Sequence, residues 1–284
     1  IRDERTSRGL GDVYKRQLIR GVKNGPSPKW LQNRLRAIGL RPISTLVDIT
    51  NFFTYDTNRP LHVFDADKLN GTSIRVHDAL GGEKFSALDD KEYVLSKGMT
   101  VISDSEGIES LAGIMGGSAS GCTDTTENVF IEAAYFNPIR TAYTGRELKI
   151  NSDARYRFER GIDPEWTAFG IEAATKMIIE LCGGEPSNVV QAGEIPNHGR
   201  AYKVDTARIE SLVGMAIPPH KQLNILENLG FVIKGDTASV PSWRPDIQGE
   251  ADLVEEIARV VSLTKLQGIP VSYTHLTLPT TDRG

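Results

Sequence analysis

The sequence predicts an α+β protein with two domains, a strand-rich mixed domain followed by a small winged-helix-like α/β domain. Short alternating apolar runs separated by Gly and Asp turns fill the region from Ser73 to Phe136, which is typical of a sheet. From Pro138 onward the apolar residues recur at helical spacing. A second, short series of elements begins near Arg200, which indicates a separate unit.

The elements of the first domain can be assigned in order. A basic strand, LIRGVKN, precedes a helix in PSPKWLQNRLRAIGL that Gly39 ends. Residues 41–69 predict a helical or mixed apolar segment and then a loop rich in Asp, Asn and Pro. After the strand-rich region, DPEWTAFGIEAATKMIIELCGG predicts an amphipathic helix with Asp163 as its N-cap and two glycines at its end.

The second domain combines a strand, two helices and a hairpin. These are AYKVD, TARIESLVG, HKQLNILENLG and FVIKGDTASVPSW, and an acidic helix follows them. We therefore expect domains at residues 18–199 and 200–270. The ends, residues 1–17 and 271–284, share neither the periodicity nor the composition of the rest, and we interpret them as a non-native leader and tail.

Composition and charge exclude several classes of protein. A chain of 284 residues with 39% hydrophobic and 25% charged residues can bury substantial cores. No apolar run reaches the ~18 residues of a membrane span, so we expect a cytoplasmic protein with no membrane partner. Cys122 and Cys182 have no metal-binding spacing, which favours two reduced thiols.

The net charge of -4 gives no general reason to expect a nucleic-acid partner, and no DNA partner is expected. One local exception is the segment from Arg140 to Arg160, where cations alternate with aromatic residues. This pattern fits either a phosphate-binding surface or a surface of paired charges.

The segment PSWRPDIQGEADLVEEIARVV sets acidic residues against an amphipathic helix. Its candidate metal ligands are Asp246, Asp252, Glu255 and Glu256. Oxygen ligands of this kind suit Mg²⁺. Alternatively, the acids stabilise the start of the helix, and Glu255 pairs with Arg259.

Glu132 is the candidate functional residue of the first domain, because it shares its predicted strand face with Phe130, Ala134 and Phe136. A carboxylate on an inward apolar face has a raised pKa and is a functional-site candidate. The alternative is a structural glutamate that a backbone amide or a nearby arginine satisfies. His62 and Ser152 each have a structural alternative as well, as a packed core histidine and as a capping hydroxyl.

These segments resemble the beta-subunit family of bacterial phenylalanyl-tRNA synthetases. The shared motifs are GLRPISTLVDITN, RPLHVFD, MGGSASG, VFIEAAYF and DARYRFERG, and the acidic segment follows them, so the resemblance covers about residues 18 to 268. It implies an editing pocket formed by Arg41, His62, Gly116, Glu132, Ser152 and Ala154. Ser152 stands where many relatives carry threonine, and it keeps the hydroxyl.

The resemblance also implies a function and partners. The chain would be part of a phenylalanine-tRNA ligase, and it would hydrolyse mischarged Tyr-tRNA(Phe) with Glu132 recognising the phenolic hydroxyl. The four acids would hold Mg²⁺ shared with the alpha subunit of a heterotetramer that binds tRNA(Phe). ATP would be used by the full complex and not bound by this chain.

Two further interpretations remain open. The second domain could belong to a winged-helix nucleic-acid-binding regulator, although its second helix offers only His220 and Lys221 as cations. Alternatively, the chain could be a non-catalytic module that binds a partner through the acidic helix.

Overall fold

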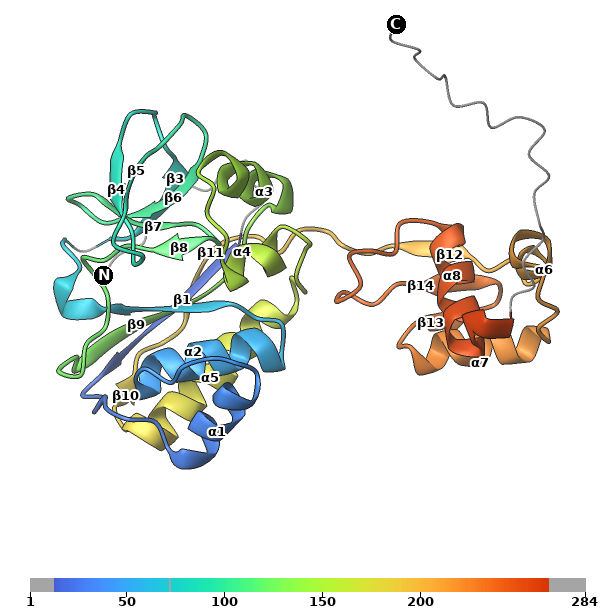
Figure 1. Ribbon diagram of the computed structural model, residues 1–284, viewed down its shortest axis with the longest axis horizontal. Helices are drawn as coiled ribbons and strands as arrows, with labels where there is room; N and C mark the ends of the chain where they lie inside the picture. Colours follow the sequence, from blue (N-terminus) through green and yellow to red (C-terminus); the bar gives the residue numbers. More distant parts are fainter. Residues whose placement is uncertain (1–12, 72, 266–284) are drawn as a thin grey trace, which may run out of the picture. The chain divides into compact units, whose positions relative to one another are not determined.

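The computed structural model describes residues 13–71 and 73–265, and its contacts divide the chain into two compact units (Figure 1). The larger unit runs to His198 and also includes Ser242–Asp246. Among the described residues, the smaller unit comprises Gly199–Pro241 and residues 247–265. Both are mixtures of helices and antiparallel sheets, which confirms the predicted α+β class.

The larger unit is built on a five-stranded antiparallel sheet. Four strands lie in the order β10 (Glu185–Pro186), β1 (Val13–Arg20), β9 (Asn128–Tyr135) and β2 (Leu61–Asp65), and β11 (Val190–Gly193) also pairs with β1. One face packs against three helices, which Figure 1 shows on one side of the sheet: α1 (Lys29–Ala37), α2 (Thr45–Asp56) and α5 (Trp166–Cys182). Val129, Ile131 and Ala133 of β9 enter that core.

The other face of the sheet packs against a second strand-rich layer (Figure 1). This layer has an antiparallel sheet in the order β3 (Arg75–Asp78), β6 (Thr100–Ser103), β7 (Ile108–Leu111) and β8 (Met115–Gly116), and a hairpin of β4 (Lys84–Ser86) and β5 (Glu92–Val94). The remaining elements of the unit are η1 (Ala66–Lys68), α3 (Pro138–Glu147) and α4 (Asp153–Phe158). Phe130, Ala134 and Phe136 lie in this second core, so β9 alternates between the two cores as a central strand should.

One predicted cap needs correction, and one boundary stays a prediction. Residues 13–17, part of the predicted non-native leader, form the first part of β1 and pair with β9 and β11; their non-native origin stays a prediction. Residues 1–12 and the predicted tail at 271–284 lie outside the described residues. Asp163 was expected to cap α5, but the N-cap is Glu165, because the Asp163 carboxylate instead accepts a hydrogen bond from the Glu165 amide in the turn before the helix.

The smaller unit has the predicted winged-helix-like order. It contains β12 (Ala201–Lys203), α6 (Arg208–Val213), α7 (Pro219–Asn228), the hairpin β13 (Val232–Lys234) and β14 (Thr237–Ser239), α8 (Glu250–Val261) and η2 (Leu263–Lys265). β14 is central in its sheet, and the apolar face of α8 packs into the core.

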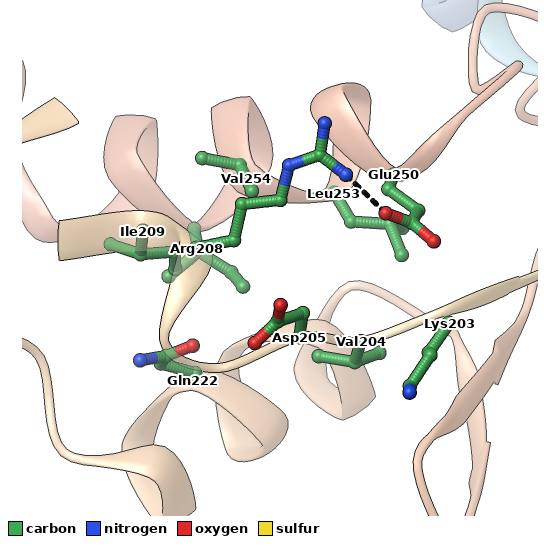
Figure 2. Close-up of a pocket in the computed structure, with 10 residues that line it drawn as sticks. Lys203, Val204, Asp205, Arg208, Ile209, Gln222, Glu250, Leu253 and Val254 are labelled. Carbon is green, nitrogen blue, oxygen red and sulfur yellow. Dashed lines mark hydrogen bonds and ion pairs between the residues drawn. The ribbon is translucent and has the colours of Figure 1, made fainter. Parts of the chain in front are cut away.

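A crevice between α6 and α8 in this unit has a volume of only about 10 Å³, room for about one water molecule. Figure 2 shows Arg208 reaching across it to pair with Glu250. The crevice is therefore a packing feature rather than a ligand site. None of the helices in the described ranges has the length and apolar character needed to cross a membrane.

Candidate functional site

A cavity of about 310 Å³ lies between the two layers of the larger unit. Its walls come from β2, the β7–β8 turn, β9 and α4, which are distant in sequence. Five of the six predicted pocket residues line it: His62, Gly116, Glu132, Ser152 and Ala154. The remaining lining residues are mainly apolar: Pro60, Leu61, Leu88, Ser110, Leu111, Gly113, Ile114, Met115 and Phe158.

Glu132 is the acidic group of this cavity and is only 6% exposed. It lies on the face of β9 that carries Phe130 and Ala134, as the alternation predicts. Its Oε2 atom accepts no hydrogen bond from the described residues. Burial raises the pKa of Glu132 to about 8, and the Tyr14 hydroxyl opposes this shift. The Oε2 atom is therefore the acceptor that this apolar cavity offers to a hydroxyl-bearing ligand.

His62 lies directly across from Glu132 on the neighbouring strand β2. Burial lowers the pKa of His62 to about 4, so the ring is neutral near pH 7. The ring packs edge-on against Phe64 with centroids 4.3 Å apart. A neutral imidazole in this position can orient water or an ester group by hydrogen bonding.

Gly116 provides the space that the His62 ring occupies. A Cβ atom at Gly116 would lie 2.3 Å from His62 Cε1 and 2.6 Å from Nε2, closer than real Cβ contacts allow. The Gly116 carbonyl accepts a hydrogen bond from the Leu88 amide, and the Gly117 amide donates to the Glu109 carbonyl. These backbone groups are therefore engaged within the protein, and the role that the geometry gives Gly116 is steric.

Ser152 connects α4 to the β7–β8 turn. Its hydroxyl donates to the Ile114 carbonyl at 2.6 Å and accepts from the Arg155 amide at 3.1 Å, so it caps α4. The capping alternative from the sequence therefore describes Ser152 well. This cap fixes the helix that carries Ala154 and Phe158 into the cavity wall.

Arg41 is exposed in the segment before α2 and is not among the residues that line the cavity. Its editing role remains a prediction.

The four predicted metal ligands are largely engaged with other groups. Asp246 pairs with Arg244, Asp252 accepts a hydrogen bond from the Gln248 amide, and buried Glu256 pairs with Arg259 at 2.6 Å. The alternative prediction that Glu255 pairs with Arg259 was wrong. Arg259 pairs with Glu256, three residues before it, and Glu255 is exposed. Among residues 13–71 and 73–265, no group of three or more His, Cys, Asp or Glu side chains is arranged to hold a metal ion. The donor set of this chain therefore does not by itself fit Mg²⁺.

The segment Arg140–Arg160 is largely a surface of paired charges. Four of its arginines form ion pairs with carboxylates: Arg140 with Asp78, Arg155 and Arg160 with Glu159, and Arg157 with Asp153. Arg155 also donates to the carbonyls of Gly145 and Ile150, so it holds α4 against the end of α3.

Arg59 is fully buried, although no sequence pattern singled it out as a functional residue. Arg59 donates to the carbonyl of Ala134 at 2.9 Å and to that of Asp163, so it ties β9 to the start of α5. It directly precedes the Pro60-Leu61-His62 segment of the cavity wall. The one sequence feature that marks Arg59 is its position before Pro60. A charged residue beside a loop is normally exposed, so burial was not expected.

Neither cysteine is a reactive group. Burial raises the pKa of Cys122 to about 12 and that of Cys182 to about 11, so both stay protonated at neutral pH. This agrees with the expectation of two thiols without an assigned role.

Two family descriptions match the chain, one for each unit. The B3/4 domain matches residues 11–183, and the tRNA synthetase B5 domain matches residues 202–262. The chain therefore belongs to the B3/4 domain family, and its B3/4 domain is followed by a tRNA synthetase B5 domain.

The curated relatives narrow this class to one kind of protein. The chain is 63% identical over 269 residues to the phenylalanine-tRNA ligase beta subunit of Ruegeria pomeroyi. The matched region covers 95% of this chain and 34% of that protein. It is 62% identical over 259 residues to the same subunit of Cereibacter sphaeroides, covering 91% and 32%. For Mesorhizobium japonicum the identity is 50% over 261 residues, covering 90% and 32%. The chain thus spans about a third of the length of these relatives.

The solved structures that match include an N-terminal fragment of the phenylalanyl-tRNA synthetase beta subunit from Pyrococcus horikoshii. The sequences are 15% identical and the TM-score is 0.38, over 87% of this chain and 69% of that one. A likeness at this level adds nothing to the assignment.

Proposed function

We propose that this chain is the editing part of a phenylalanine-tRNA ligase beta subunit, and that the cavity between its two layers hydrolyses Tyr-tRNA(Phe). The observation that carries the proposal is Glu132, a buried acid with an unpaired Oε2 atom in an otherwise apolar cavity. A volume of about 310 Å³ is enough for a tyrosyl side chain and its ester. The kinship with beta subunits supports the choice of aminoacyl-tRNA as substrate.

Discrimination between tyrosine and phenylalanine follows from the buried acid. A synthetic site built for phenylalanine rejects an added hydroxyl only weakly, by about 10²-fold in comparable synthetases. In the editing cavity the phenolic hydroxyl would hydrogen-bond Glu132. Phenylalanine would leave that acid unpaired inside an apolar cavity, at a cost of about 1 to 3 kcal/mol. Glu132 therefore selects tyrosine positively.

Hydrolysis requires a water molecule to attack the ester carbonyl. The bond between the carbonyl carbon and the ribose oxygen breaks, which releases tyrosine and a free ribose hydroxyl. His62 lies opposite Glu132 and is neutral near pH 7, so it orients the water or the ester by hydrogen bonding. Its low pKa makes it a weak base, so its contribution is mainly positional.

The test replaces Glu132 with Ala and with Gln and measures deacylation of Tyr-tRNA(Phe) and Phe-tRNA(Phe). In Glu132→Ala, loss of the hydroxyl contact should lower kcat/KM for the tyrosyl ester by about tenfold or more and narrow the preference over phenylalanine. Glu132→Gln keeps an acceptor oxygen in place of the mainly protonated acid, so it should lose less. Glu109→Gln is a matched control, because Glu109 is 7% exposed, has an unpaired Oε2 among the described residues and does not line the cavity. Unchanged rate and discrimination in both Glu132 variants would remove the assignment.

The wider functions of the relatives come to this chain as proposals. We propose that it joins an alpha subunit in a cytoplasmic heterotetramer that charges tRNA(Phe) with phenylalanine, with ATP bound outside this chain. Mg²⁺ would then require the partner to complete its ligands, because Asp246, Asp252 and Glu256 are engaged within the chain. Mg²⁺ titration followed by thermal unfolding, with and without the alpha subunit, tests this.

The two other interpretations receive less support. A regulator needs a cationic recognition helix, and α7 offers only His220 and Lys221. A non-catalytic module gives no reason for an acid whose Oε2 atom accepts no hydrogen bond from the described residues of an apolar cavity. The deacylation assay separates both from editing.

A further inference from the structure

A second hollow of about 280 Å³ lies in the larger unit, where α2 ends and α5 begins. It is lined by Thr57, Asn58, Asp163, Trp166 and Trp243. None of these residues lines the cavity around Glu132, so this is a separate site. We refer to it as the indole groove.

The groove is a fixed feature of the fold. Gly161 has a φ of +89°, and a Cβ there would lie 2.9 Å from Pro245 Cβ, so Pro245 packs closely on the turn between α4 and α5. That contact anchors Trp243, two residues earlier, in the larger unit. On the opposite side, buried Arg59 follows Asn58 and donates to the Asp163 carbonyl, which ties the end of α2 to the start of α5.

Two indole rings from distant parts of the chain form the apolar surface of the groove. Trp243 is 56% exposed, so much of its ring faces solvent. Trp166 packs against the exposed Phe169 ring with centroids 5.4 Å apart. The Trp166 Nε1 donor is buried and has no acceptor among the described residues. These features favour a flat ligand that stacks on indole and carries a hydrogen-bond acceptor.

The polar residues of the groove can form hydrogen bonds with groups on the edge of such a ligand. The Asp163 Oδ1 atom accepts from the Glu165 amide, and a carboxylate has further acceptor capacity. It therefore suits an amino group on the ligand and repels a carbonyl oxygen. Asn58 adds an amide that both donates and accepts.

Stacked arginine–aromatic pairs lie close by in the sequence. The Arg157 guanidinium is 4.3 Å from the centroid of Tyr55, two residues before Thr57. The Arg160 guanidinium is 3.7 Å from the centroid of Tyr156, which is 54% exposed, and Asp163 follows three residues later. Both arginines are also ion-paired, Arg157 with Asp153 and Arg160 with Glu159, so these pairs contribute aromatic surface rather than free cations. Bases stack on aromatic rings of this kind in proteins that bind single-stranded nucleic acid.

We propose that the indole groove binds an unpaired nucleobase of single-stranded RNA, stacked on Trp243 and Trp166, with Asp163 selecting a base that carries an exocyclic amino group. Cytosine therefore binds better than uracil, because its amino group donates to the carboxylate where uracil presents a carbonyl. The choice of RNA as the partner rests on the proposed function. Binding of a base in the indole groove does not depend on Glu132 or on the aminoacyl ester, because the groove and the cavity around Glu132 share no lining residue.

The experiment measures the fluorescence anisotropy of labelled hexacytidylate and hexauridylate with the full chain at low salt. Hexacytidylate should bind on the order of tenfold more tightly than hexauridylate, the effect of one hydrogen bond to a charged acceptor. Trp243→Ala should weaken hexacytidylate binding on the order of tenfold or more, through lost stacking. Asp163→Asn keeps the acceptor for the Glu165 amide and should bring the ratio of the two affinities close to one.

Two control variants show whether binding depends on the indole groove. Trp30→Ala removes a 44% exposed indole on α1 that packs against Phe52, and it should leave both affinities unchanged. Glu132→Gln should also leave them unchanged, so a failure of the editing assignment does not affect this result. Equal affinities of the wild-type chain for the two hexamers, or full binding by Trp243→Ala, would overturn the proposal.

Discussion

At the scale of single residues, burial gives the cavity its chemistry. The same desolvation raises the pKa of Glu132 to about 8 and lowers that of His62 to about 4. Both groups are therefore mainly uncharged near neutral pH, although an acid and a base face each other across two strands. An aromatic side chain can enter this cavity without displacing the hydration shell of an ion.

The raised pKa of Glu132 predicts how stability depends on pH. Between its ordinary pKa of 4.5 and the folded value of about 8, the folded chain holds a proton that the unfolded chain has lost. Stability therefore falls as the pH rises through this window and levels off above it. From about pH 6.5 to about pH 8.5, the free energy of unfolding should drop by about 2 kcal/mol through this group.

The groups that face Glu132 do not reverse this sign. Arg16 on β1 and His62 on β2 lie directly opposite, and the Tyr14 hydroxyl favours the charged form; burial outweighs these influences. Urea unfolding at the two pH values should show that Glu132→Gln removes most of the drop. Glu255→Gln, a change at an exposed acid, should keep it. A Glu132→Gln chain with the full wild-type drop would contradict the assigned pKa.

At the scale of elements, the strand alternation of β9 was readable from the sequence, and it predicted which face Glu132 occupies. The cavity wall was only partly readable, because Leu88 and Met115 reach it through hairpin and turn geometry that has no periodic signal. Buried Arg59 was not predictable, since its partners are backbone carbonyls more than 70 residues away. The alternation of residues along a strand therefore predicts which face a side chain occupies. Hydrogen bonds between residues far apart in the sequence can be identified only once the fold is known.

Ser152 affects both the stability of α4, which it caps, and the shape of the cavity, which it lines. Ser152→Ala removes the acceptor for the Arg155 amide and the donor to the Ile114 carbonyl, so it should lower the free energy of unfolding by about 1 to 2 kcal/mol. Ser152→Thr keeps the hydroxyl and should lose less than half as much. Chemical denaturation measures both, and equal losses would show that the hydroxyl is not the stabilising group.

At the scale of the whole molecule, the two units have separate cores. Leu226 is fully buried in the core of the smaller unit, and Ile131 is fully buried under the helices of the larger one. Within the described residues, neither core contains residues of the other unit. Each unit should therefore open on its own.

Leu226→Ala should test this independence directly. The cavity it leaves should destabilise the smaller unit by about 2 to 5 kcal/mol and speed amide hydrogen exchange in α7 and β13. Exchange in β9 and β2 should stay at the wild-type rate, so the cavity around Glu132 keeps its shape. Ile131→Ala is the reciprocal control and should speed exchange in β9 while leaving α7 and β13 at the wild-type rate. Faster exchange in β9 of the Leu226→Ala chain, measured by mass spectrometry, would instead show that the two units open together.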